Sequence, residues 1–484
     1  MRIVQMVPSL NYGDAIGNYI IAIKHIIEDM GYKTAIYCNS IHEKITEPDV
    51  YLVDDLDNLK TTDVVIYHMS IGSELNHIVA DYKCRKVMIY HNITPPHFFE
   101  IDCAEKVESC RQGLEDVKAL AGKFDHCIAV SDFNRRDLIS MGYDADTIDV
   151  VPIIVALDDY KQKPDQEIID HYNDGYTNIL FVGRVAPNKK HEDMIRAFAY
   201  YKENVNPKSR LILAGSHGGI NNYYTDLVSY IEELGVRDIE FTSHISFAGI
   251  LGLYKSADVF LCLSEHEGFC VPLVEAMVFD VPIIAYDSCA VPETMGGSGI
   301  VVDNKNPVFL SKVIDRVVND EQLRQHMIES QRKRLDDFRF EPLSRQFREI
   351  LENFLDGMKK KNKKVNSQYS VLYDIVNNRM KKSGSEIPFS KDVFLNCSEL
   401  APGCADVASL IDSNMDNKSF FEAAYYTFFY RLPTPGEYEF WDIDIKETST
   451  YDFQKKLSQH LVDIVNSKEF ADIKINVCSN LFKR

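Results

Sequence analysis

Hydrophobic residues in the first 155 positions are grouped in short, β-branched runs that alternate with stretches of helical period. The runs are MRIVQMV, TAIYC, DVVIYHM, KVMIYHN, HCIAVS and IDVVPII, and the clearest helical stretch is YIIAIKHIIEDMG. Regular alternation of strand and helix is typical of a parallel sheet with helices packed on it. We therefore expect an α/β, Rossmann-like domain over residues 1–160.

A second series of the same kind follows the polar stretch Lys161–Thr177. Its members are NILFVG, the helical HEDMIRAFAYYKEN, RLILAGS, IEFTS, DVFLCLS, VPIIAY and GIVVD. Because the alternation starts again, we expect a second Rossmann-like domain over residues 161–340. The length of 484 residues agrees with this division, since single hydrophobic cores stop growing at about 250 to 300 residues.

The pattern changes after Pro307, where the periodicity becomes helical and amphipathic up to Phe354. A basic and polar segment, 359–375, follows and begins with a run of five lysines between positions 359 and 364. Over residues 376–484 the pattern is helical and aromatic, and no strand alternation is visible in it. We therefore expect a linker followed by a separate α-helical module.

The C-terminal module has an aromatic cluster of near-helical spacing, which predicts a helix core rather than a carbohydrate platform. The cluster is Phe420, Phe421, Tyr425, Tyr426, Phe428, Phe429 and Tyr430. Its sequence FFYRLPTPGEYEFW, followed by VDIVNSKEF, resembles a short helical module found at the ends of bacterial surface-polysaccharide and surface-layer proteins. The lysine run is either a solvated linker or a contact with anionic lipid, where each lysine adds about 1 kcal/mol.

Composition and charge exclude several classes of protein. The apolar fraction of 45% and the charged fraction of 26% are ordinary for a globular protein. A net charge of −20 argues against general nucleic-acid binding, which requires a basic face. The start of the chain predicts a strand rather than a signal peptide, and no apolar run approaches 18 residues. The eleven scattered cysteines are expected to be reduced core thiols, so we expect a cytoplasmic protein.

The segment SEHEGFCVPLVEAMVFDVPIIAYDSCAVPET carries the most informative chemistry, with Glu267 and Glu275 separated by seven residues. Glu267 is expected in the loop after the strand VFLCLS, and Pro272 suits the first turn of the helix that carries Glu275. The backbone N–H groups of Gly268, Phe269 and Cys270 would then face a diphosphate at the N-terminus of this helix. The alternative is that both glutamates only favour a helix N-terminus electrostatically.

Two other loops predict phosphate contacts. In FVGRVAPNKKHEDMIRAF, Arg184 and Lys189 lie five residues apart between a strand and a helix, and two such cations suit one diphosphate. The loop SLNYGDAIGNY, which contains Gly13, Asp14 and Ala15, joins the first strand to the first helix, a position at which backbone amides commonly approach phosphate. The dinucleotide fingerprint GxGxxG is absent from this loop.

Histidines end two of the predicted strands, His68 in VVIYHM and His91 in VMIYHNITPPHFF. The carboxyl ends of parallel strands face the ligand crevice in open α/β sheets. For metals, the sequence offers only isolated pairs, such as Asp144 with Asp146 and Asp442 with Asp444. We therefore expect no metal site.

Taken together, SEHEGF, PLVEAM and AVPET closely resemble retaining glycosyltransferases of family 4, over roughly residues 1–355. The resemblance implies the GT-B fold: two facing Rossmann-like domains with a cleft between them, the first completed by a crossing helix at 341–358. It also implies that Arg184 and Lys189 bind the donor diphosphate, with Lys190 in place of a more usual glycine. It assigns Glu267 to the donor sugar and Glu275 to the ribose, and it carries over His91 but not His68. The loop SLNYGDAIGNY resembles the family's glycine-containing loop that lines the sugar cleft, which makes Gly13, Asp14 and Ala15 candidate site residues.

The function that the resemblance implies is retaining, metal-independent transfer of a hexose from a nucleoside-diphosphate sugar. The acceptor would be a glycan or lipid-linked glycan in bacterial surface-polysaccharide synthesis. GDP-mannose is favoured over UDP-sugars, no cofactor is expected, and peripheral contact with the inner membrane or with other polysaccharide enzymes stays open. The alternatives are a non-catalytic glycan-binding or scaffold protein of the same fold, a sugar-nucleotide epimerase and a glycan phosphorylase.

Overall fold

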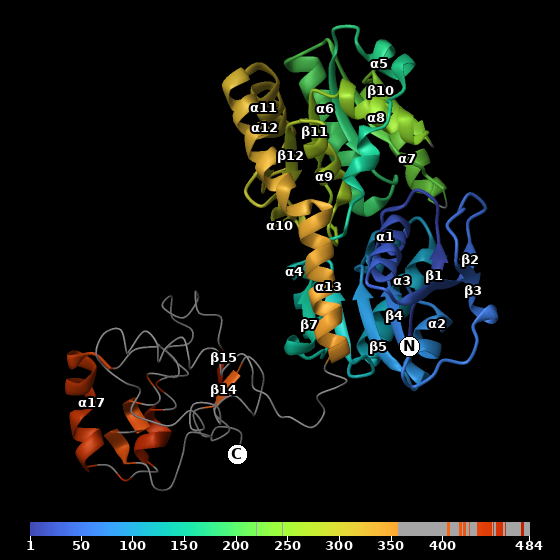
Figure 1. The fold of residues 1–484 in the computed structure, drawn as a ribbon. Helices are drawn as coiled ribbons and strands as arrows, with labels where there is room; N and C mark the ends of the chain where they lie inside the picture. The colour runs from blue at the N-terminus through green and yellow to red at the C-terminus, as the bar shows by residue number, and fades with distance from the viewer. Residues whose placement is uncertain are drawn as a thin grey trace. The chain divides into compact units, whose positions relative to one another are not determined.

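The computed structural model describes residues 1–356 apart from 219 and 244, together with parts of the remaining chain. Those parts are 404–406, 416–418, 420–422, 425, 433–447, 449, 452–457, 460 and 476–478. The chain divides into two compact units, Met1–Leu355 and Asp356–Arg484, and each is described by itself. Figure 1 shows the elements of both units.

The first domain of the larger unit is built on a seven-stranded parallel sheet in the order β3-β2-β1-β4-β5-β6-β7. All six residues of β4 are buried, as expected for a strand covered by helices on both faces. The strands are β1 (Arg2–Leu10), β2 (Lys33–Ile41), β3 (Val50–Leu52), β4 (Val64–Met69), β5 (Arg85–Tyr90), β6 (His126–Ala129) and β7 (Ile148–Val150). The helices are α1 (Ala15–Asp29), α2 (Glu74–Asp81), α3 (Ala104–Ala119) and α4 (Asp132–Ser140).

The second domain has a six-stranded parallel sheet in the order β10-β9-β8-β11-β12-β13. Its strands are β8 (Thr177–Val182), β9 (Ser209–Ala214), β10 (Ile239–Ser243), β11 (Val259–Cys262), β12 (Ile283–Tyr286) and β13 (Ile300–Val302). Its helices are α5 (Gln166–Tyr172), α6 (His191–Asn204), α7 (Asn221–Leu234), α8 (Phe247–Ser256), α9 (Val271–Val278), α10 (Val291–Met295), α11 (Pro307–Asn319) and α12 (Glu321–Leu335). The predicted pair of Rossmann-like domains is confirmed.

Each sheet reverses its strand order at the strand that begins it in the chain. β1 lies between β2 and β4, and β8 lies between β9 and β11. Ligands of open α/β sheets bind beyond the carboxyl ends of the strands at such a reversal. The loops that follow β1 and β8, which carry Asp14 and Arg184, are therefore at the two positions where this topology favours a ligand.

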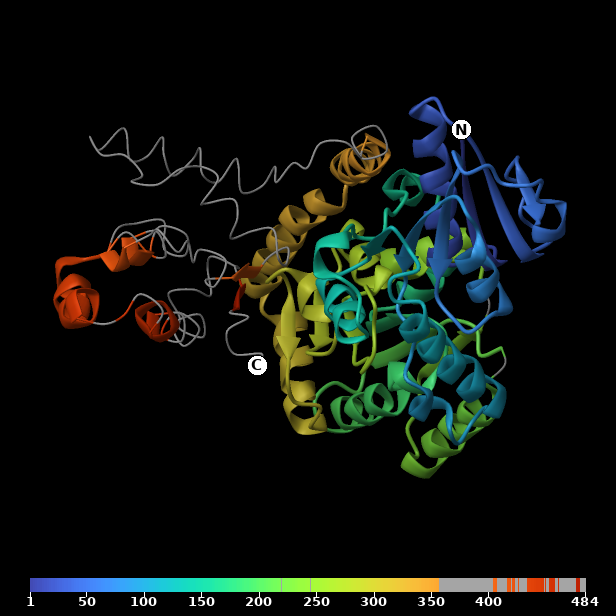
Figure 2. The ribbon, with the colours of Figure 1, turned by 90° about the horizontal axis from the view of Figure 1, so that it is seen from below.

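The helix α13 (Phe340–Asp356) leaves the second domain and packs on the first. The Arg85 Nη1 atom donates to the Phe354 carbonyl at 2.7 Å, and the guanidinium lies 3.7 Å from the centre of the Phe354 ring. The Gln346 side chain donates to the Val150 carbonyl at 2.8 Å. Figure 2 shows α13 nearly end-on beside the elements of the first domain. The first domain is thus completed by residues from the end of this unit.

In the smaller unit, the structure describes the helix α17 (Pro435–Glu447) and buried aromatic side chains around it. Trp441 is buried, and its ring centre lies 5.8 Å from that of Phe453 and 6.1 Å from that of Phe421. Phe420, Phe421 and Tyr425 of the predicted cluster are also buried. The lysine run, the linker at 359–375 and the cluster members Tyr426, Phe428, Phe429 and Tyr430 lie outside the described residues.

A short parallel strand pair, β14 (Cys404–Asp406) and β15 (Asn476–Cys478), accompanies this helical part. The sequence analysis expects no strand there. Three residues are too few for alternation of period two to stand out, and the partners lie far apart in the chain. Among the described residues, no helix has both the length and the apolar character needed to cross a bilayer.

Candidate functional site

The loop after β8 holds Arg184 through a close approach of two backbones. A Cβ atom on Gly215 would lie 1.9 Å from the Gly183 carbonyl oxygen, so only glycine fits there. The Val185 N–H donates to the Ser216 carbonyl at 3.0 Å and fixes the loop to the end of β9. The Arg184 side chain is exposed and has no hydrogen-bond or ion-pair partner among the described residues. Its guanidinium is available to an anion.

Lys189 and Glu267 form a direct ion pair, with 2.6 Å between the Lys189 Nζ and Glu267 Oε1 atoms. Their loops are joined by Asn188, whose side chain donates to the His266 carbonyl at 3.0 Å and whose carbonyl accepts from the Glu265 N–H at 2.8 Å. Burial alone would lower the pKa of Lys189, but the adjacent Glu267 carboxylate outweighs it, and the pKa is raised. Lys189 is therefore a fixed cation.

The helix α9 begins directly after the Glu267 loop and presents an uncapped N-terminus. Its N-cap residue, Cys270, has a left-handed backbone with φ of 72° and makes no side-chain capping bond. The N–H groups of Gly268, Phe269 and Cys270 donate no hydrogen bond to any described residue. Free N–H groups and the helix dipole favour an anion at this position.

Glu275 lies one turn into α9, and both of its carboxylate oxygens accept hydrogen bonds from tyrosine hydroxyls. Tyr160 donates to Oε1 at 2.6 Å and Tyr254 donates to Oε2 at 2.6 Å. Burial raises the pKa of Glu275, and the two hydroxyls oppose this shift. Tyr160 belongs to the connection between the two sheets, in the 3-10 turn Leu157–Lys161. A ligand hydroxyl at Glu275 would share this carboxylate with the tyrosines.

The first domain contributes the loop between β1 and α1. Gly13 has a left-handed backbone with φ of 74°, and Asp14 caps α1 by accepting from the Gly17 N–H at 2.5 Å. Burial raises the pKa of Asp14, while the Gly17 N–H and the positive charge of Arg184 oppose the rise. Ala15 is the first residue of α1. The positive charge of Arg184, in the loop after β8, thus acts on Asp14, in the loop after β1.

His91 follows β5 and is buried, with its Nε2 atom 2.9 Å from the Nδ1 atom of His68. Burial lowers the pKa of His91 to about 3, so its imidazole is neutral. The neighbouring Asn92 accepts a hydrogen bond from the second domain, because the His266 Nε2–H group donates to Asn92 Oδ1 at 3.0 Å. A Cβ atom on Gly268 would lie 2.6 Å from the Asn92 Cβ and 3.0 Å from the His91 carbonyl oxygen. The Glu267 loop therefore contacts the end of β5 directly.

Among the described residues, one group has the composition of a metal site: Cys262, Glu267 and Cys270. Their ligand atoms all lie within 4.8 Å of one another, and all three residues are buried. The same Glu267 carboxylate already pairs with the Lys189 ammonium. The sequence does not predict this group, because Cys262 and Cys270 lie on either side of a loop and have no ligand spacing typical of zinc.

Sequence reasoning missed the residues that hold the site together: Gln5, Asn92, Asn188, Tyr160 and Tyr254. All of them are polar side chains that bond to residues outside their own element, and Tyr160 and Glu275 are 115 positions apart in the chain. A single sequence offers no signal for such pairs. The predicted residues other than Glu275 lie in loops after the ends of strands or at the starts of helices, and Glu275 lies one turn into α9.

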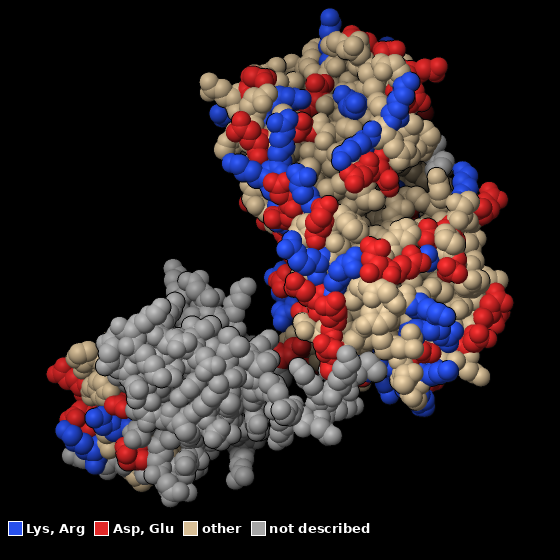
Figure 3. Space-filling view, viewed as in Figure 1, with Lys and Arg blue, Asp and Glu red and all other residues tan. Residues whose placement is uncertain are grey.

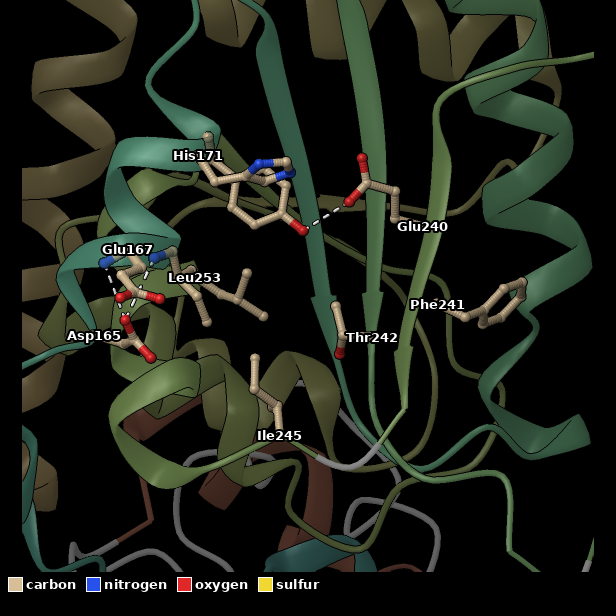
Figure 4. A pocket seen from close by; sticks show the side chains of 10 residues that line it. Asp165, Glu167, His171, Glu240, Phe241, Thr242, Ile245 and Leu253 are labelled. Atoms are coloured by element: carbon tan, nitrogen blue, oxygen red, sulfur yellow. Dashed lines mark hydrogen bonds between the residues drawn. The ribbon is translucent and has the colours of Figure 1, made fainter.

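A separate pocket of about 320 Å³ lies between α5, α8 and β10, the edge strand of the second sheet. The Tyr172 hydroxyl donates to Glu240 at 2.7 Å. Figure 4 shows Glu240, Thr242 and Ile245 among the side chains that line the pocket. None of the predicted site residues lines it. On the face shown in Figure 3, acidic and basic side chains are interspersed, without the continuous basic area that nucleic-acid binding requires.

Comparison with known proteins adds a domain family and relatives. Residues 163–334 match the family model described as glycosyl transferases group 1. The O-antigen chain mannosyltransferase B of Escherichia coli is 26% identical over 253 residues, which are 50% of this chain and 63% of that protein. An α-1,4-N-acetyl-D-galactosaminyltransferase of Campylobacter jejuni, which extends a diNAcBac-PP-undecaprenol glycan by its name, is 23% identical over 36% of this chain and 47% of that protein. The chain thus spans about half to three fifths of the length of these relatives.

Solved structures show the fold. Anabaena HepE in complex with UDP-glucose has a TM-score of 0.60 at 18% identity, covering 73% of this chain and 100% of that one. WaaG, a glycosyltransferase involved in lipopolysaccharide biosynthesis, has a TM-score of 0.56 at 15% identity, covering 71% and 98%. The larger unit of the chain has the GT-B fold, with two Rossmann-like domains facing each other.

Proposed function

We propose that the chain transfers a hexose from a nucleoside-diphosphate sugar to a hydroxyl of a glycan or lipid-linked glycan. The observation that carries this proposal is the group of anion-binding features at one end of the second sheet. Arg184 is an exposed cation without a partner among the described residues, and Lys189 is a cation held by Glu267. The N-terminus of α9, which follows the Glu267 loop, presents free N–H groups. The match of residues 163–334 to group 1 glycosyl transferases supports it.

Each residue has a distinct role in this proposal. Arg184 and Lys189 neutralise the diphosphate as negative charge develops on it, and the N–H groups of 268–270 contribute donors without reorganisation. Glu267 binds hydroxyls of the donor sugar, and Glu275, oriented by Tyr160 and Tyr254, binds the ribose. Gly13, Asp14 and Ala15 line the opposite side, where the acceptor approaches. His91 contacts the donor sugar from the first domain.

The reaction we propose retains the configuration at the sugar carbon C1. The acceptor oxygen forms its bond to C1 on the face from which the phosphate leaves, as the bond from C1 to the phosphate oxygen breaks. The acceptor hydroxyl proton passes to that phosphate oxygen, so no side chain acts as a covalent nucleophile. Fixed cations around the leaving oxygens stabilise this transition state more than the ground state.

We propose GDP-mannose as the donor in preference to UDP-hexoses, and surface polysaccharide as the product. The support is the mannosyltransferase named among the relatives and the polysaccharide and lipopolysaccharide enzymes beside it. A second outcome is possible in the same assay, because HepE was solved with UDP-glucose. The base and sugar are therefore the first variables to test.

The experiment is a screen of GDP- and UDP-sugars with the full chain, in which released nucleotide and the anomeric configuration of the product are measured. We expect Arg184→Ala and Lys189→Ala each to lower kcat/KM by about a hundredfold or more, because each removes a cation from the leaving diphosphate. Arg237→Ala and Lys255→Ala are matched controls, since both are exposed and neither is a predicted site residue. Near-normal turnover in both site variants would refute the donor-site assignment, and nucleotide binding without transfer would favour a scaffold role.

A further inference from the structure

A chain of buried polar side chains runs across three neighbouring strands of the first sheet. Gln5 lies in β1, His68 in β4 and His91 directly after β5, and the sheet places these strands side by side. The Gln5 Oε1 atom lies 2.9 Å from His68 Nε2, and His68 Nδ1 lies 2.9 Å from His91 Nε2. Gln5 and His68 are fully buried, and His91 is 8% exposed.

In this row of side chains, the Gln5 amide fixes which atom donates and which accepts in each hydrogen bond. The Gln5 Nε2 group donates to the Ile20 carbonyl at 3.0 Å, so it is the Gln5 Oε1 atom that meets His68. Oε1 can only accept, and the hydrogen of His68 must therefore be on Nε2. Burial lowers the pKa of His68, and it remains neutral with an accepting Nδ1 atom.

The tautomer of His68 determines the tautomer of His91. Because His68 Nδ1 accepts, His91 Nε2 must carry the hydrogen. Burial lowers the pKa of His91 to about 3, so its other nitrogen, Nδ1, bears a lone pair at neutral pH. Any other placement of these hydrogens would make two lone pairs or two N–H groups face each other at one of the two contacts. Both contacts are buried, where a polar group without a hydrogen bond is destabilising.

The Nδ1 atom of His91 is buried and has no hydrogen-bond partner among the described residues. Tyr19 places its ring edge-on to both imidazoles, with ring centres 6.4 Å from His68 and 5.7 Å from His91, but its hydroxyl is not bonded to either. A buried acceptor aimed at no protein donor is the kind of group that a ligand hydroxyl satisfies.

We propose that Gln5 and His68 are positioning residues that hold His91 in the Nε2–H tautomer, so that its Nδ1 atom accepts a hydrogen bond from a hydroxyl of the donor sugar. The ligand part of this inference rests on the proposed function. The tautomer makes this position specific for a group that donates, and it rejects a phosphate oxygen, which can only accept. Nδ1 is buried in this structure, so a ligand hydroxyl reaches it only after the side chains around it move.

The tautomer can be measured without any donor, by ¹⁵N NMR of the full chain labelled at histidine. We expect the Nδ1 of His91 to be unprotonated and its Nε2 protonated throughout the range from neutral to mildly alkaline pH. A protonated Nδ1 in the unaltered protein would overturn the proposal, whatever its activity. This first measurement needs no variant and is unaffected if a substitution disturbs folding.

Two substitutions of His68 separate its two ring nitrogens. In His68→Asn the side-chain oxygen takes the place of Nδ1 and still accepts from His91, whereas in His68→Gln the amide lies at the position of Nε2 and leaves His91 without an acceptor. We expect His68→Asn to keep the single tautomer, and His68→Gln to show both tautomers of His91 with the donor KM raised about tenfold. His126→Gln is the matched control, because His126 pairs with Asp149 at the start of β6.

The outcomes distinguish this inference from the proposed function. If no sugar nucleotide is turned over, the proposed function fails, while the tautomer and its response to His68→Gln still test the role of Gln5 and His68. If transfer occurs and His68→Gln and His68→Asn have the same donor KM, the tautomer does not control donor binding and the proposal is overturned. A donor sugar with fluorine in place of the bonded hydroxyl should have the same KM with the unaltered protein and with His68→Gln, because fluorine cannot donate a hydrogen bond.

Discussion

Four residues around the candidate site hold a left-handed backbone although they are not glycine: Asn92, Lys190, Cys270 and Cys289, with φ of 76°, 56°, 72° and 49°. Such conformations cost about 1 to 3 kcal/mol each and persist where the surroundings fix them. All four lie in the loops that join the ends of strands to the following elements. Part of the backbone strain of the larger unit thus lies in the loops around the candidate site.

Lys190 allows the cost of a left-handed backbone to be measured, because the resembling family usually has a glycine at this position. Its ammonium lies 3.3 Å from Glu192 and 3.4 Å from Glu265, which are weak, partly exposed pairs. We expect Lys190→Gly to change the free energy of unfolding by less than about 0.5 kcal/mol, since relief of the backbone offsets the lost pairs. Lys190→Val should cost about 1 kcal/mol or more, because a β-branched residue is poorly tolerated at positive φ. Urea unfolding of both variants measures the difference, and equal stability would contradict it.

The buried His191 predicts a loss of stability in acid. Neither ring nitrogen has a hydrogen-bond partner among the described residues, and burial lowers its pKa to about 3, below the ordinary 6.5. The unfolded chain therefore takes up a proton between these values that the folded chain does not, and stability falls as pH falls through this window. We expect His191→Phe to make the fall shallower by up to about 1.4 kcal/mol per pH unit. Urea titrations from pH 7 to pH 4 test this, and an unchanged slope would show that His191 is protonated in the fold.

Turnover should survive a chelator. The Lys189 ammonium already occupies Glu267, so a cation bound by Cys262, Glu267 and Cys270 would have to displace it. We expect nucleotide release to be unchanged after dialysis against EDTA. Loss of activity that magnesium or manganese restores would assign a metal to the reaction, and loss that only zinc restores would point to the two thiols.

At the scale of elements, the sequence predicted what depends on local pattern. The strand VVIYHM is apolar because both faces of β4 are covered, and the Pro272 signal marked the start of α9 within two residues. The pairing of His68 with His91, and of Glu275 with Tyr160, depends on which strands and turns meet in space. No periodicity carries that information, so the sequence predicts candidate site residues but not the partners of those residues.

A contact between α10 and α4 also crosses between the domains and should matter for activity. The Glu293 carboxylate, from α10, accepts from the N–H groups of Asp132 at 2.7 Å and Phe133 at 3.2 Å, and so satisfies the N-terminus of α4. We expect Glu293→Ala to cost about 1 kcal/mol of stability, as loss of a helix cap does, and also to raise the donor KM. Glu329→Ala, at an exposed position of α12, is the control. A KM equal to that of the unaltered chain would limit Glu293 to a structural role.

At the scale of the whole molecule, the predicted donor residues lie between Gly13 and Glu275, inside the larger unit. We expect a chain shortened to end at Lys364 to keep donor turnover on a soluble acceptor and to lose assembly or membrane recovery on the natural one. A chain ending at Arg339 should lose turnover, because it lacks α13 and its contacts with Arg85 and Val150. Kinetics and membrane-fraction recovery of the three lengths measure both effects. If the longer truncated chain stays folded without turnover, residues beyond 364 help to build the site.

The return of α13 to the first domain means that the polypeptide passes between the two domains twice, once after β7 and once after the 3-10 turn Asp336–Phe338. A pair of bodies joined at a single point can swivel in any direction, whereas two attachments leave bending about the line through them as the easiest movement. We therefore expect the two domains to open and close by rotation about one axis, the line through the two connections. Each closure would then bring His91 and Glu267 back to the same relative position, even when no substrate is bound.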